Sequence, residues 1–354
     1  MMKIGILTWY FAMNHGARAH TYALLHTLRE CGYDAEIIRY RPWREYIDVE
    51  PYWFVSRNIP LMMKRFKYRQ YFSRSEKDYK YFSRIVRSAE EVDRLEYDLI
   101  ILGSDEIFNI NHLITSRDYT YFGVGIEKTP KITYAVSCGQ SGEDTKWPKE
   151  IVDTVKKIRA LSARDKNSCK IVERNTGRMP ELVLDPTLLL DFSKLNDPDW
   201  KYKNYILIYT FGGVEEYKDE IIQYAHEHKL KIVCVGNDFQ WADIRVPYPR
   251  QETWYAAFAY ASLVITNSFH GTIFAIKNKI PFVNILMADK ETKIANLLEQ
   301  FGMDFKDQLM NRHHRIEECL LKKNDYDLIT KKVTIETEKS KMWLNEEIQR
   351  CFQK

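Results

Sequence analysis

The chain has 354 residues, 45% of them hydrophobic, and its 53 Lys plus Arg nearly balance its 49 Asp plus Glu, which leaves a net charge of +4. This length and apolar content predict a compact protein of about two domains. So small a net charge argues against a nucleic-acid partner, and no stretch approaches the ~20 apolar residues of a membrane-spanning helix.

Cysteine usage and the start of the chain bear on the compartment. The cysteines form no CxxC pair, which indicates neither a zinc site nor a disulfide framework and favours a reducing, cytoplasmic setting; they are Cys31, Cys138, Cys169, Cys234, Cys319 and Cys351. The apolar run at residues 3–10 lacks a small-residue cleavage site after it. It therefore predicts a first strand and not a signal peptide.

The first half of the chain alternates strand and helix patterns. Residues 3–10 and 35–40 are apolar runs typical of strands covered on both faces, and residues 18–32 between them carry leucines at helical spacing before Gly32. Further runs predict strands at 97–103, 131–137, 157–163 and 180–186. Strand, helix and strand with short connections predict a parallel sheet.

A break in composition at residues 191–204, rich in Asp, Asn and Lys, separates two halves of the chain. A new series of strand and helix patterns follows it, and residues 333–354 read as one charged terminal helix. We therefore expect an α/β fold of two Rossmann-like, doubly wound domains facing a cleft, at residues 1–195 and 200–325. Residues 326–354 would form a helix that packs back across both domains.

Residues 41–95 depart from this order and are expected to form a helical insertion. The stretch 39–87 has thirteen Lys or Arg against five Asp or Glu, interleaved with Trp43, Trp53, Phe66, Tyr68, Tyr71 and Phe72. One interpretation is amphipathic helices with their aromatic side chains in the core. The other is a surface that contacts anionic lipid head groups or a lipid-phosphate-linked glycan, which would make the protein peripheral to the inner face of a membrane.

Loops rich in Gly, Ser, Asn and Asp follow most of the predicted strands. Ligands bind where such loops converge in open parallel sheets, so a cleft lined by them is the expected ligand site. The candidates in the first half are Asn14 and Gly16 in "NHGA" and Ser104 and Asp105 in "GSDEIFN". A helix cap is the alternative interpretation of Ser104 and Asp105.

The segment "NSFHG" holds the strongest candidates, Asn267, Ser268, His270 and Gly271. A helix that starts at about Gly271 would have Ser268 just before it, and its N-terminal end would favour an anion such as phosphate. A histidine there is suited to proton transfer near neutral pH. The alternative is a helix cap beside a histidine that is hydrogen-bonded for structure.

The segment "LSARDKNS" places Arg164 and Asp165 directly after an apolar run. A guanidinium binds a carboxylate or a phosphate through two hydrogen bonds, which suits an acidic small substrate. An Arg–Asp pair that caps the next helix explains the same letters. Asp185, which precedes Pro186, is explained by a rigid turn without any function.

Several known site patterns are missing from the chain. There is no GxGxxG after the first strand, no GxxxxGK[ST], no GxSxG and no HExxH. These absences argue against a dinucleotide cofactor, a P-loop, a hydrolase elbow and catalytic zinc. We therefore predict neither a metal ion nor a cofactor.

Six motifs in order, from about residue 3 to 305, resemble the polysaccharide pyruvyl transferase family. "NHGARAHTYALLHTLRECGYDAEIIRY" resembles the family's NYGAxLQAYAL opening, "YDLIILGSDEIFN" its GSDQxWN segment and "ITYAVSCG" its YAxSxG strand. "LSARDKNS" resembles its SxRE or SxRD turn, "ELVLDPTLLLD" its DPTxLL stretch and "VITNSFHGTIFAIKNKIPFV" its SFHGxxFA segment.

The resemblance implies a fold like that of GT-B glycosyltransferases and a transfer of pyruvate from phosphoenolpyruvate to two hydroxyls of a sugar. The product would be a ketal, with release of phosphate. The acceptor would be a sugar, a glycan or a lipid-linked glycan of a surface polysaccharide. His270 would be the acid/base residue, Arg164 would bind the donor's carboxylate or phosphate, and Asp105 would contact donor or acceptor.

The chain also departs from the family's pattern. Several members have Arg-Leu-His where this chain has Ser268, Phe269 and His270, which removes one expected phosphate partner. The family's usual tyrosine and glutamine in the opening motif are His15 and His20 here. A GT-B-like glycosyltransferase that uses a nucleotide sugar, or a noncatalytic member in surface-glycan biosynthesis, is the alternative.

Overall fold

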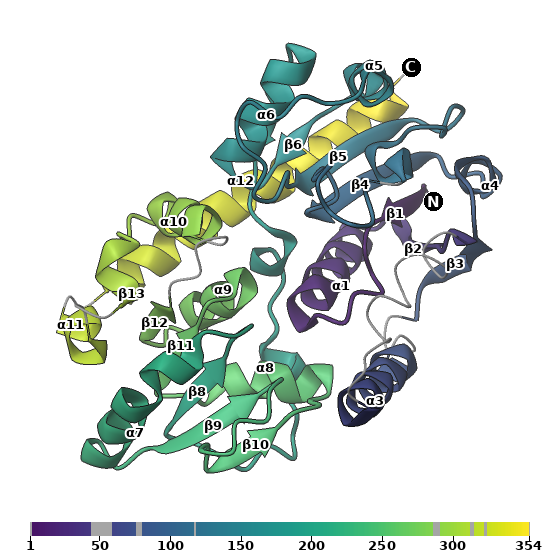
Figure 1. Ribbon diagram of the computed structural model, residues 1–354. Helices are drawn as coiled ribbons and strands as arrows, with labels where there is room; N and C mark the ends of the chain where they lie inside the picture. The colour runs from purple at the N-terminus through teal and green to yellow at the C-terminus, as the bar shows by residue number, and fades with distance from the viewer. Residues whose placement is uncertain are drawn as a thin grey trace. The chain divides into compact units, whose positions relative to one another are not determined.

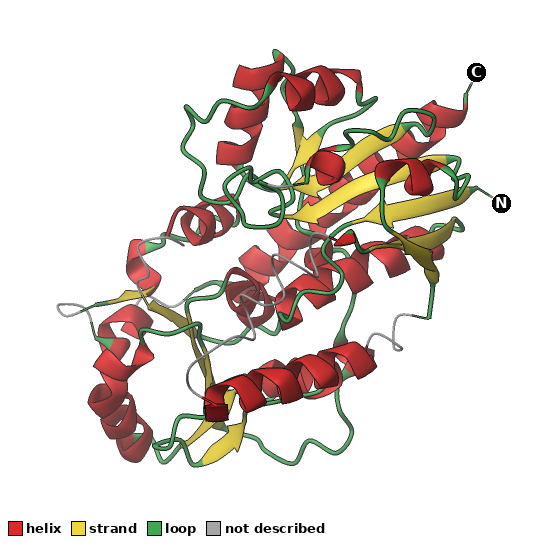
Figure 2. Cartoon of the chain, turned by 45° about the vertical axis from the view of Figure 1, so that its right-hand side comes forward, coloured by secondary structure: helices red, strands yellow, loops and turns green. Residues whose placement is uncertain are grey.

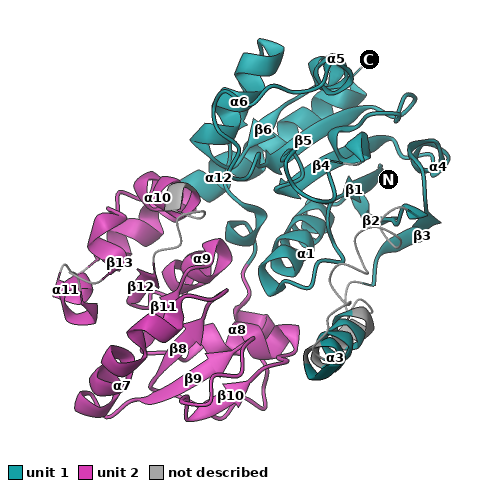
Figure 3. Ribbon diagram, in the orientation of Figure 1, with its two compact units in different colours: residues 1–190, 336–354 teal, residues 191–335 magenta. Residues whose placement is uncertain are grey.

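The structure is a computed structural model that describes residues 2–43, 59–75, 80–116, 118–285, 291–311, 315–321 and 324–353. It divides into two compact units (Figure 3). Unit 1 comprises Met1–Leu190 with Glu336–Lys354, and unit 2 comprises Asp191–Ile335. Trp53 lies outside the described residues, as do residues 44–58 of the predicted insertion.

Within the described residues, unit 1 holds one parallel sheet in the order β3-β2-β1-β4-β5-β6-β7 (Figure 1). The strands are β1 (Lys3–Leu7), β2 (Asp34–Tyr40), β3 (Phe82–Val86), β4 (Leu99–Asp105), β5 (Lys131–Val136), β6 (Ser162–Ala163) and β7 (Glu181–Leu182). The chain runs outward from β1 to β3 and then returns to β4, which pairs with β1 on its other side. The order in which the chain adds strands to the sheet therefore reverses between β1 and β4.

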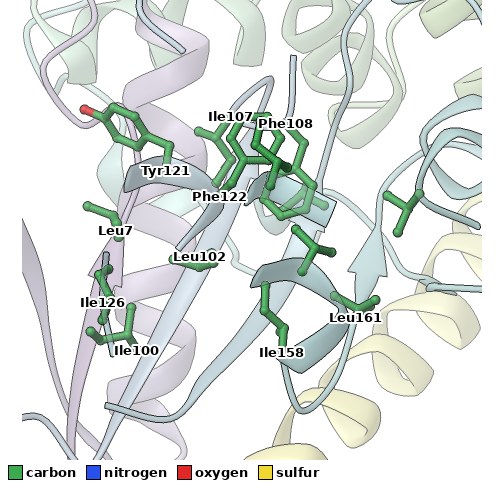
Figure 4. Packing of buried hydrophobic residues seen from close by; sticks show 14 of the residues in the cluster. Leu7, Ile100, Leu102, Ile107, Phe108, Tyr121, Phe122, Ile126, Ile158 and Leu161 are labelled. Carbon is green, nitrogen blue, oxygen red and sulfur yellow. The ribbon is translucent and has the colours of Figure 1, made fainter. Parts of the chain in front are cut away.

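Helices accompany this sheet, as Figures 1 and 2 show. They are α1 (His15–Glu30), α3 (Ile59–Ser75), α4 (Ala89–Asp93), α5 (Lys149–Lys157) and α6 (Lys166–Thr176), with short 3₁₀ turns η3 (Tyr119–Phe122) and η4 (Pro186–Leu188). The predicted helical insertion thus also contains a strand, β3, at the sheet's edge. In the core, Phe108 and Phe122 stack with ring centroids 4.7 Å apart (Figure 4).

Unit 2 holds a second parallel sheet, which in the described part of the chain has the order β10-β9-β8-β11-β12-β13. The strands are β8 (Tyr205–Tyr209), β9 (Lys231–Val235), β10 (Ile244–Val246), β11 (Leu263–Thr266), β12 (Phe282–Ile285) and β13 (Leu309–Met310). The helices are α7 (Lys218–Glu227), α8 (Gln251–Ala259), α9 (Phe269–Lys277), α10 (Glu291–Gln300) and α11 (Ile316–Leu321), with 3₁₀ turns η5 (Ser193–Leu195), η6 (Val214–Tyr217) and η7 (Lys306–Gln308). In this sheet the strand order reverses between β8 and β11.

The last helix, α12 (Tyr326–Phe352), lies within the predicted range 326–354 and has a part in each unit. In its unit 1 part, the Ser340 hydroxyl accepts a hydrogen bond from Leu184 N at 3.0 Å, and Thr337 Oγ1 donates to Leu188 O at 3.2 Å. In its unit 2 part, the Tyr326 hydroxyl donates to Ile280 O at 2.7 Å. Across the described residues, no helix combines the length and the apolar character that crossing a membrane requires.

Continuous apolar strands explain the two sheets. All of β8 and four of the five residues of β1 are buried, as expected for strands that are covered on both faces. The predicted strands at 157–163 and 180–186 are much shorter in the structure, where the two-residue strands β6 and β7 pair and Ala160 forms an isolated bridge with Ile132. Their remaining apolar residues are buried without belonging to a strand, Leu161 and Val183 among them.

Candidate functional site

Each sheet has one point where its strand order reverses, and the predicted site residues gather at these two points. In unit 1, Asn14 follows β1, and Ser104 and Asp105 end β4. In unit 2, Asn267, Ser268 and the rest of "NSFHG" follow β11. Because open α/β sheets bind ligands outside the carboxyl ends of strands at such reversals, both points are candidate ligand sites.

In unit 1, Arg164 joins two carboxylates from different strand ends. Its Nη1 lies 2.8 Å from Asp185 Oδ2, and its Nη2 lies 3.1 Å from Asp105 Oδ1. The other carboxylate oxygen of Asp105 lies 3.4 Å from His20 Nε2. These four residues are called the Asp105 cluster below.

Burial within the Asp105 cluster is uneven. The side chains of Arg164 and Asp185 are 3% and 1% exposed and that of His20 is 0% exposed, whereas that of Asp105 is 15% exposed. Asp105 is therefore the member of the cluster whose charged group reaches solvent. Of the three buried members, Arg164 and His20 contact Asp105, and Asp185 contacts Arg164.

The electrostatics of the cluster keep Arg164 charged. Burial by itself would lower the pKa of Arg164, but the carboxylates of Asp105 and Asp185 outweigh it and raise the pKa above its usual value. A buried carboxylate needs such a partner, since an unpaired ion is costly away from water. Asp185 Oδ1 also accepts hydrogen bonds from Thr187 N at 3.0 Å and Thr187 Oγ1 at 2.6 Å, so the predicted turn role and the ion pair coexist.

The end of β4 is shaped by close backbone approach. A Cβ at Gly103, whose φ is +147°, would collide with the carbonyl oxygen of Tyr134. The buried Ser104 hydroxyl donates to Ala135 O at 3.0 Å. Asp105 has φ of +76°, a left-handed conformation that aspartate tolerates better than most residues. The cap interpretation of Ser104 and Asp105 is wrong, because the next helical turn after β4 is η3, which starts at Tyr119.

Asp165 caps helix α6, as one of the two interpretations of "LSARDKNS" predicts. Its Oδ1 accepts a hydrogen bond from Ser168 N at 2.7 Å, and its Oδ2 accepts one from Ser137 Oγ at 2.8 Å. The Arg164 guanidinium contacts Asp105 and Asp185. The two neighbouring residues therefore have separate tasks.

Asn14 and Gly16 begin helix α1. Asn14 Oδ1 accepts hydrogen bonds from Gly16 N at 2.8 Å and Ala17 N at 3.3 Å, which satisfies two N–H groups of the first turn. This cap fixes the start of the helix that carries His20. A contact of Asn14 or Gly16 with substrate stays a prediction.

In unit 2, Asn267 ties the end of β11 to the end of β8. Its Oδ1 accepts a hydrogen bond from Phe211 N at 2.8 Å, and its Nδ2 donates to Gly212 O at 2.8 Å. Thr266 Oγ1 donates to Tyr209 O at 2.6 Å. The loops on both sides of the reversal point are therefore fixed to each other.

Ser268 is the N-cap of α9, and His270 lies in the first turn of that helix. Ser268 Oγ accepts a hydrogen bond from Gly271 N at 3.3 Å. A Cβ at Gly271 would collide with Thr266 Oγ1, which explains the glycine. The His270 residue is 6% exposed, and its ring lies edge-on to that of Phe269 with centroids 5.4 Å apart. The predicted cap is thus present, and the proton-transfer role of His270 stays a prediction.

Sequence reasoning missed His20 and Asp185 as members of a site. The sequence around Asp185 does indicate a buried ion pair, because an aspartate inside the apolar run "ELVLDPTLLL" needs a buried cation as partner. His20 lies on the buried side of α1, five residues after the helix begins. Among the described residues, no three His, Cys, Asp or Glu side chains gather closely enough to hold a metal ion.

Comparison with known proteins places these residues inside one family signature. The model of the polysaccharide pyruvyl transferase family matches residues 14–287, which includes both reversal points. A search of curated protein sequences found no match to the chain.

Two solved structures with a similar fold carry the name of UDP-N-acetylglucosamine 2-epimerase. The Listeria monocytogenes protein assigned as a UDP-N-acetylglucosamine 2-epimerase is 10% identical, with a TM-score of 0.56 over 99% of this chain and 97% of its own. The UDP-GlcNAc 2-epimerase of Neisseria meningitidis, bound to UDP-GlcNAc, is 8% identical, with a TM-score of 0.53 over 99% and 100% of the two chains. The predicted fold class, two Rossmann-like α/β units of the GT-B kind, is confirmed.

Proposed function

The chain belongs to the polysaccharide pyruvyl transferase family, and from this premise we propose that it transfers pyruvate from phosphoenolpyruvate to two hydroxyls of a glycan sugar. The product is a ketal, and phosphate is released. The observation that carries the proposal is the family match over residues 14–287, which spans the Asp105 cluster and the "NSFHG" turn together. Both lie at reversal points of parallel sheets, where this architecture binds its ligands.

The reaction proposed here balances without a metal ion or a redox step. A proton adds to the CH₂ carbon of phosphoenolpyruvate while one sugar hydroxyl forms a bond to C2. The C2–O bond to phosphate then breaks, and the second hydroxyl attacks C2 and closes the ring. One hydroxyl proton ends on the new methyl group and the other on phosphate.

We assign the proton transfers to His270. A histidine titrates near neutral pH, and general acid–base catalysis contributes roughly 10²–10⁴ in rate. Its place in the first turn of α9 supports this role, because the positive end of a helix dipole favours the phosphate group of the donor. Ser268 and Gly271 support the role by fixing the turn.

We assign to Asp105 a hydrogen bond to an acceptor hydroxyl. Its partial exposure allows the contact, Arg164 Nη2 donates a hydrogen bond to its Oδ1, and His20 Nε2 lies 3.4 Å from its Oδ2. Arg164 is also proposed to bind the donor's acidic groups. The burial of Arg164 supports a role in orienting Asp105 more directly than a role in donor binding, because both of its terminal nitrogens already contact carboxylates.

The test uses the purified full chain with phosphoenolpyruvate and a panel of glycan acceptors. We expect acceptor-dependent phosphate release and a new pyruvyl methyl signal by NMR. His270→Ala is expected to lose at least ~10²-fold in kcat, whereas His226→Ala, which changes an exposed histidine of α7, keeps the wild-type rate. Full activity of His270→Ala contradicts its role. Stabilisation against thermal unfolding by nucleotide sugars and not by phosphoenolpyruvate contradicts the donor and favours a glycosyltransferase.

A further inference from the structure

Helix α3 presents a row of apolar side chains to solvent. Ile59, Met62, Met63 and Phe66 follow the spacing i, i+3, i+4 and i+7, which places them on one face of the helix. They are 63%, 37%, 55% and 53% exposed, respectively. We call these four residues the α3 stripe.

The opposite face of α3 is the one that packs against helix α1 of the same unit. Phe72 is 2% exposed, and its ring lies 4.9 Å from that of His15 and 4.5 Å from the guanidinium of Arg18. Tyr68 packs edge-on to Phe72 with centroids 4.7 Å apart. At about 100° per residue, Tyr68 and Phe72 lie roughly opposite the α3 stripe. The helix is therefore anchored to α1 by one face while the α3 stripe faces away from it.

The charge of α3 has one sign. The helix contains five basic residues and no acidic ones, namely Lys64, Arg65, Lys67, Arg69 and Arg74. Lys67 and Arg69 fall on the two flanks of the α3 stripe, roughly 90° to one side and 70° to the other. An apolar strip between two basic flanks is the pattern of a helix that lies in a lipid–water interface.

We propose that α3 docks on an anionic lipid surface. The α3 stripe enters the boundary between head groups and acyl chains, and Lys67 and Arg69 contact the lipid phosphates. A planar negative surface meets the convex apolar face and both basic flanks at once. The inference depends on one helix of unit 1 and goes beyond the proposed function, so either can fail without the other.

The test measures binding of the full chain to sedimented vesicles. We expect binding to vesicles of phosphatidylcholine mixed with phosphatidylglycerol, weak binding to phosphatidylcholine alone, and a loss of binding with added salt. Met63→Glu and Lys67→Glu are each expected to weaken binding by about fivefold or more. The matched controls are Met342→Glu, at a methionine that is 61% exposed on α12, and Lys201→Glu, at an exposed lysine of unit 2, and both are expected to bind like the wild type.

Four outcomes of the binding and mass measurements overturn the proposal, and a fifth comes from thermal unfolding. They are no binding to the mixed vesicles, equal binding to both kinds of vesicle, unchanged binding of Met63→Glu, and a change of molecular mass in solution when Met63 is replaced. The last would identify the α3 stripe as a contact between copies of the chain. Thermal unfolding of each variant is measured alongside, and a lower Tm for Met63→Glu than for Met342→Glu also overturns the proposal, because the α3 stripe would then be covered within the chain.

Discussion

Arg164 and Asp185 form a salt bridge of 2.8 Å whose two side chains are 3% and 1% exposed. The same guanidinium reaches Asp105 at 3.1 Å with its other terminal nitrogen. One buried cation therefore serves a structural carboxylate and a carboxylate that reaches solvent. Any change to Arg164 acts on the stability of unit 1 and on the orientation of Asp105 together.

Two replacements of Arg164 are expected to change these two quantities by different amounts. Arg164→Ala leaves Asp185 buried without its cation and is expected to cost roughly 3–5 kcal/mol of unfolding free energy. Arg164→Lys keeps the charge but cannot offer two fixed nitrogens, so it should cost less stability and still lower kcat. Urea unfolding and steady-state kinetics measure the two quantities. Arg245→Lys, in an exposed pair with Asp238 at 3.0 Å, is the control and should change neither.

A double-mutant cycle tests whether Arg164 acts through Asp105. If it does, Asp105→Asn and Arg164→Lys each lower kcat, and the double variant is little worse than either one. If Arg164 instead binds the donor directly, Arg164→Lys mainly raises KM for phosphoenolpyruvate and its effect adds to that of Asp105→Asn. Additive effects would contradict the positioning role.

The contacts within the Asp105 cluster could not be found from sequence for a physical reason. Arg164 lies 59 residues from Asp105 and 21 from Asp185 along the chain, and the order of parallel strands brings them together. Apolar periodicity predicts that strands exist but carries no information on which strand lies beside which. Local signals did better, since a capping serine and a glycine after the apolar run "SLVI" predicted the β11–α9 turn.

In the basic and aromatic stretch 39–87, the sequence pattern did not predict which aromatic side chains are buried. One interpretation placed its aromatic side chains in the core, and the structure divides them instead. Phe72 is buried against α1, whereas Phe66, six residues earlier, is 53% exposed. Both residues are phenylalanine, so composition cannot tell the two faces of α3 apart. Only the position of α1 does.

Asp93 provides a prediction for pH dependence. Its carboxylate accepts hydrogen bonds from Glu127 N at 2.7 Å, Lys128 N at 3.1 Å and Thr129 N at 3.0 Å. Burial by itself raises the pKa of Asp93, but these hydrogen bonds outweigh it and the pKa is lowered. The ionised group therefore stabilises the folded state above the usual aspartate range, and this contribution is lost as the pH falls from about 4 through the lowered pKa.

Replacing Asp93 by asparagine removes this contribution. Asp93→Asn is expected to lower the unfolding free energy by about 1–3 kcal/mol at pH 7. The difference in unfolding free energy between the variant and the wild type should shrink as the pH falls below about 4. Urea unfolding at a series of pH values measures it. Asp153→Asn, at an exposed position of α5, is the control. A difference that stays constant down to low pH would contradict the assignment.

Gly271 is predicted to be required by packing. In Gly271→Ala the new Cβ meets Thr266 Oγ1, which is held by hydrogen bonds to Tyr209 O at 2.6 Å and from Ser268 N at 3.0 Å. The collision is expected to cost about 1–3 kcal/mol, more than the 0.5–1 kcal/mol that alanine gains in a helix. In a Thr266→Ala background the same change should cost much less. Equal costs in both backgrounds would refute the collision.

Ser268 links the stability of α9 to the identity of the donor. Ser268→Ala loses the hydrogen bond to Gly271 N and is expected to cost about 0.5–2 kcal/mol of unfolding free energy. Ser268→Arg loses the same bond but restores the arginine that several family members have at this position. It should therefore be equally destabilised yet show a lower KM for phosphoenolpyruvate, because a guanidinium pairs with phosphate through two hydrogen bonds.

The comparison of the two Ser268 variants isolates the donor contact, since both lose the cap and only one gains a cation. Thermal unfolding should give them similar Tm values, and initial rates over a range of phosphoenolpyruvate concentrations should separate their KM values. A KM that Ser268→Arg leaves at the level of Ser268→Ala would mean that no donor phosphate reaches the N-terminal end of α9. That result would remove the support that this helix gives to phosphoenolpyruvate as the donor, while the cap itself would stand on the stability data alone.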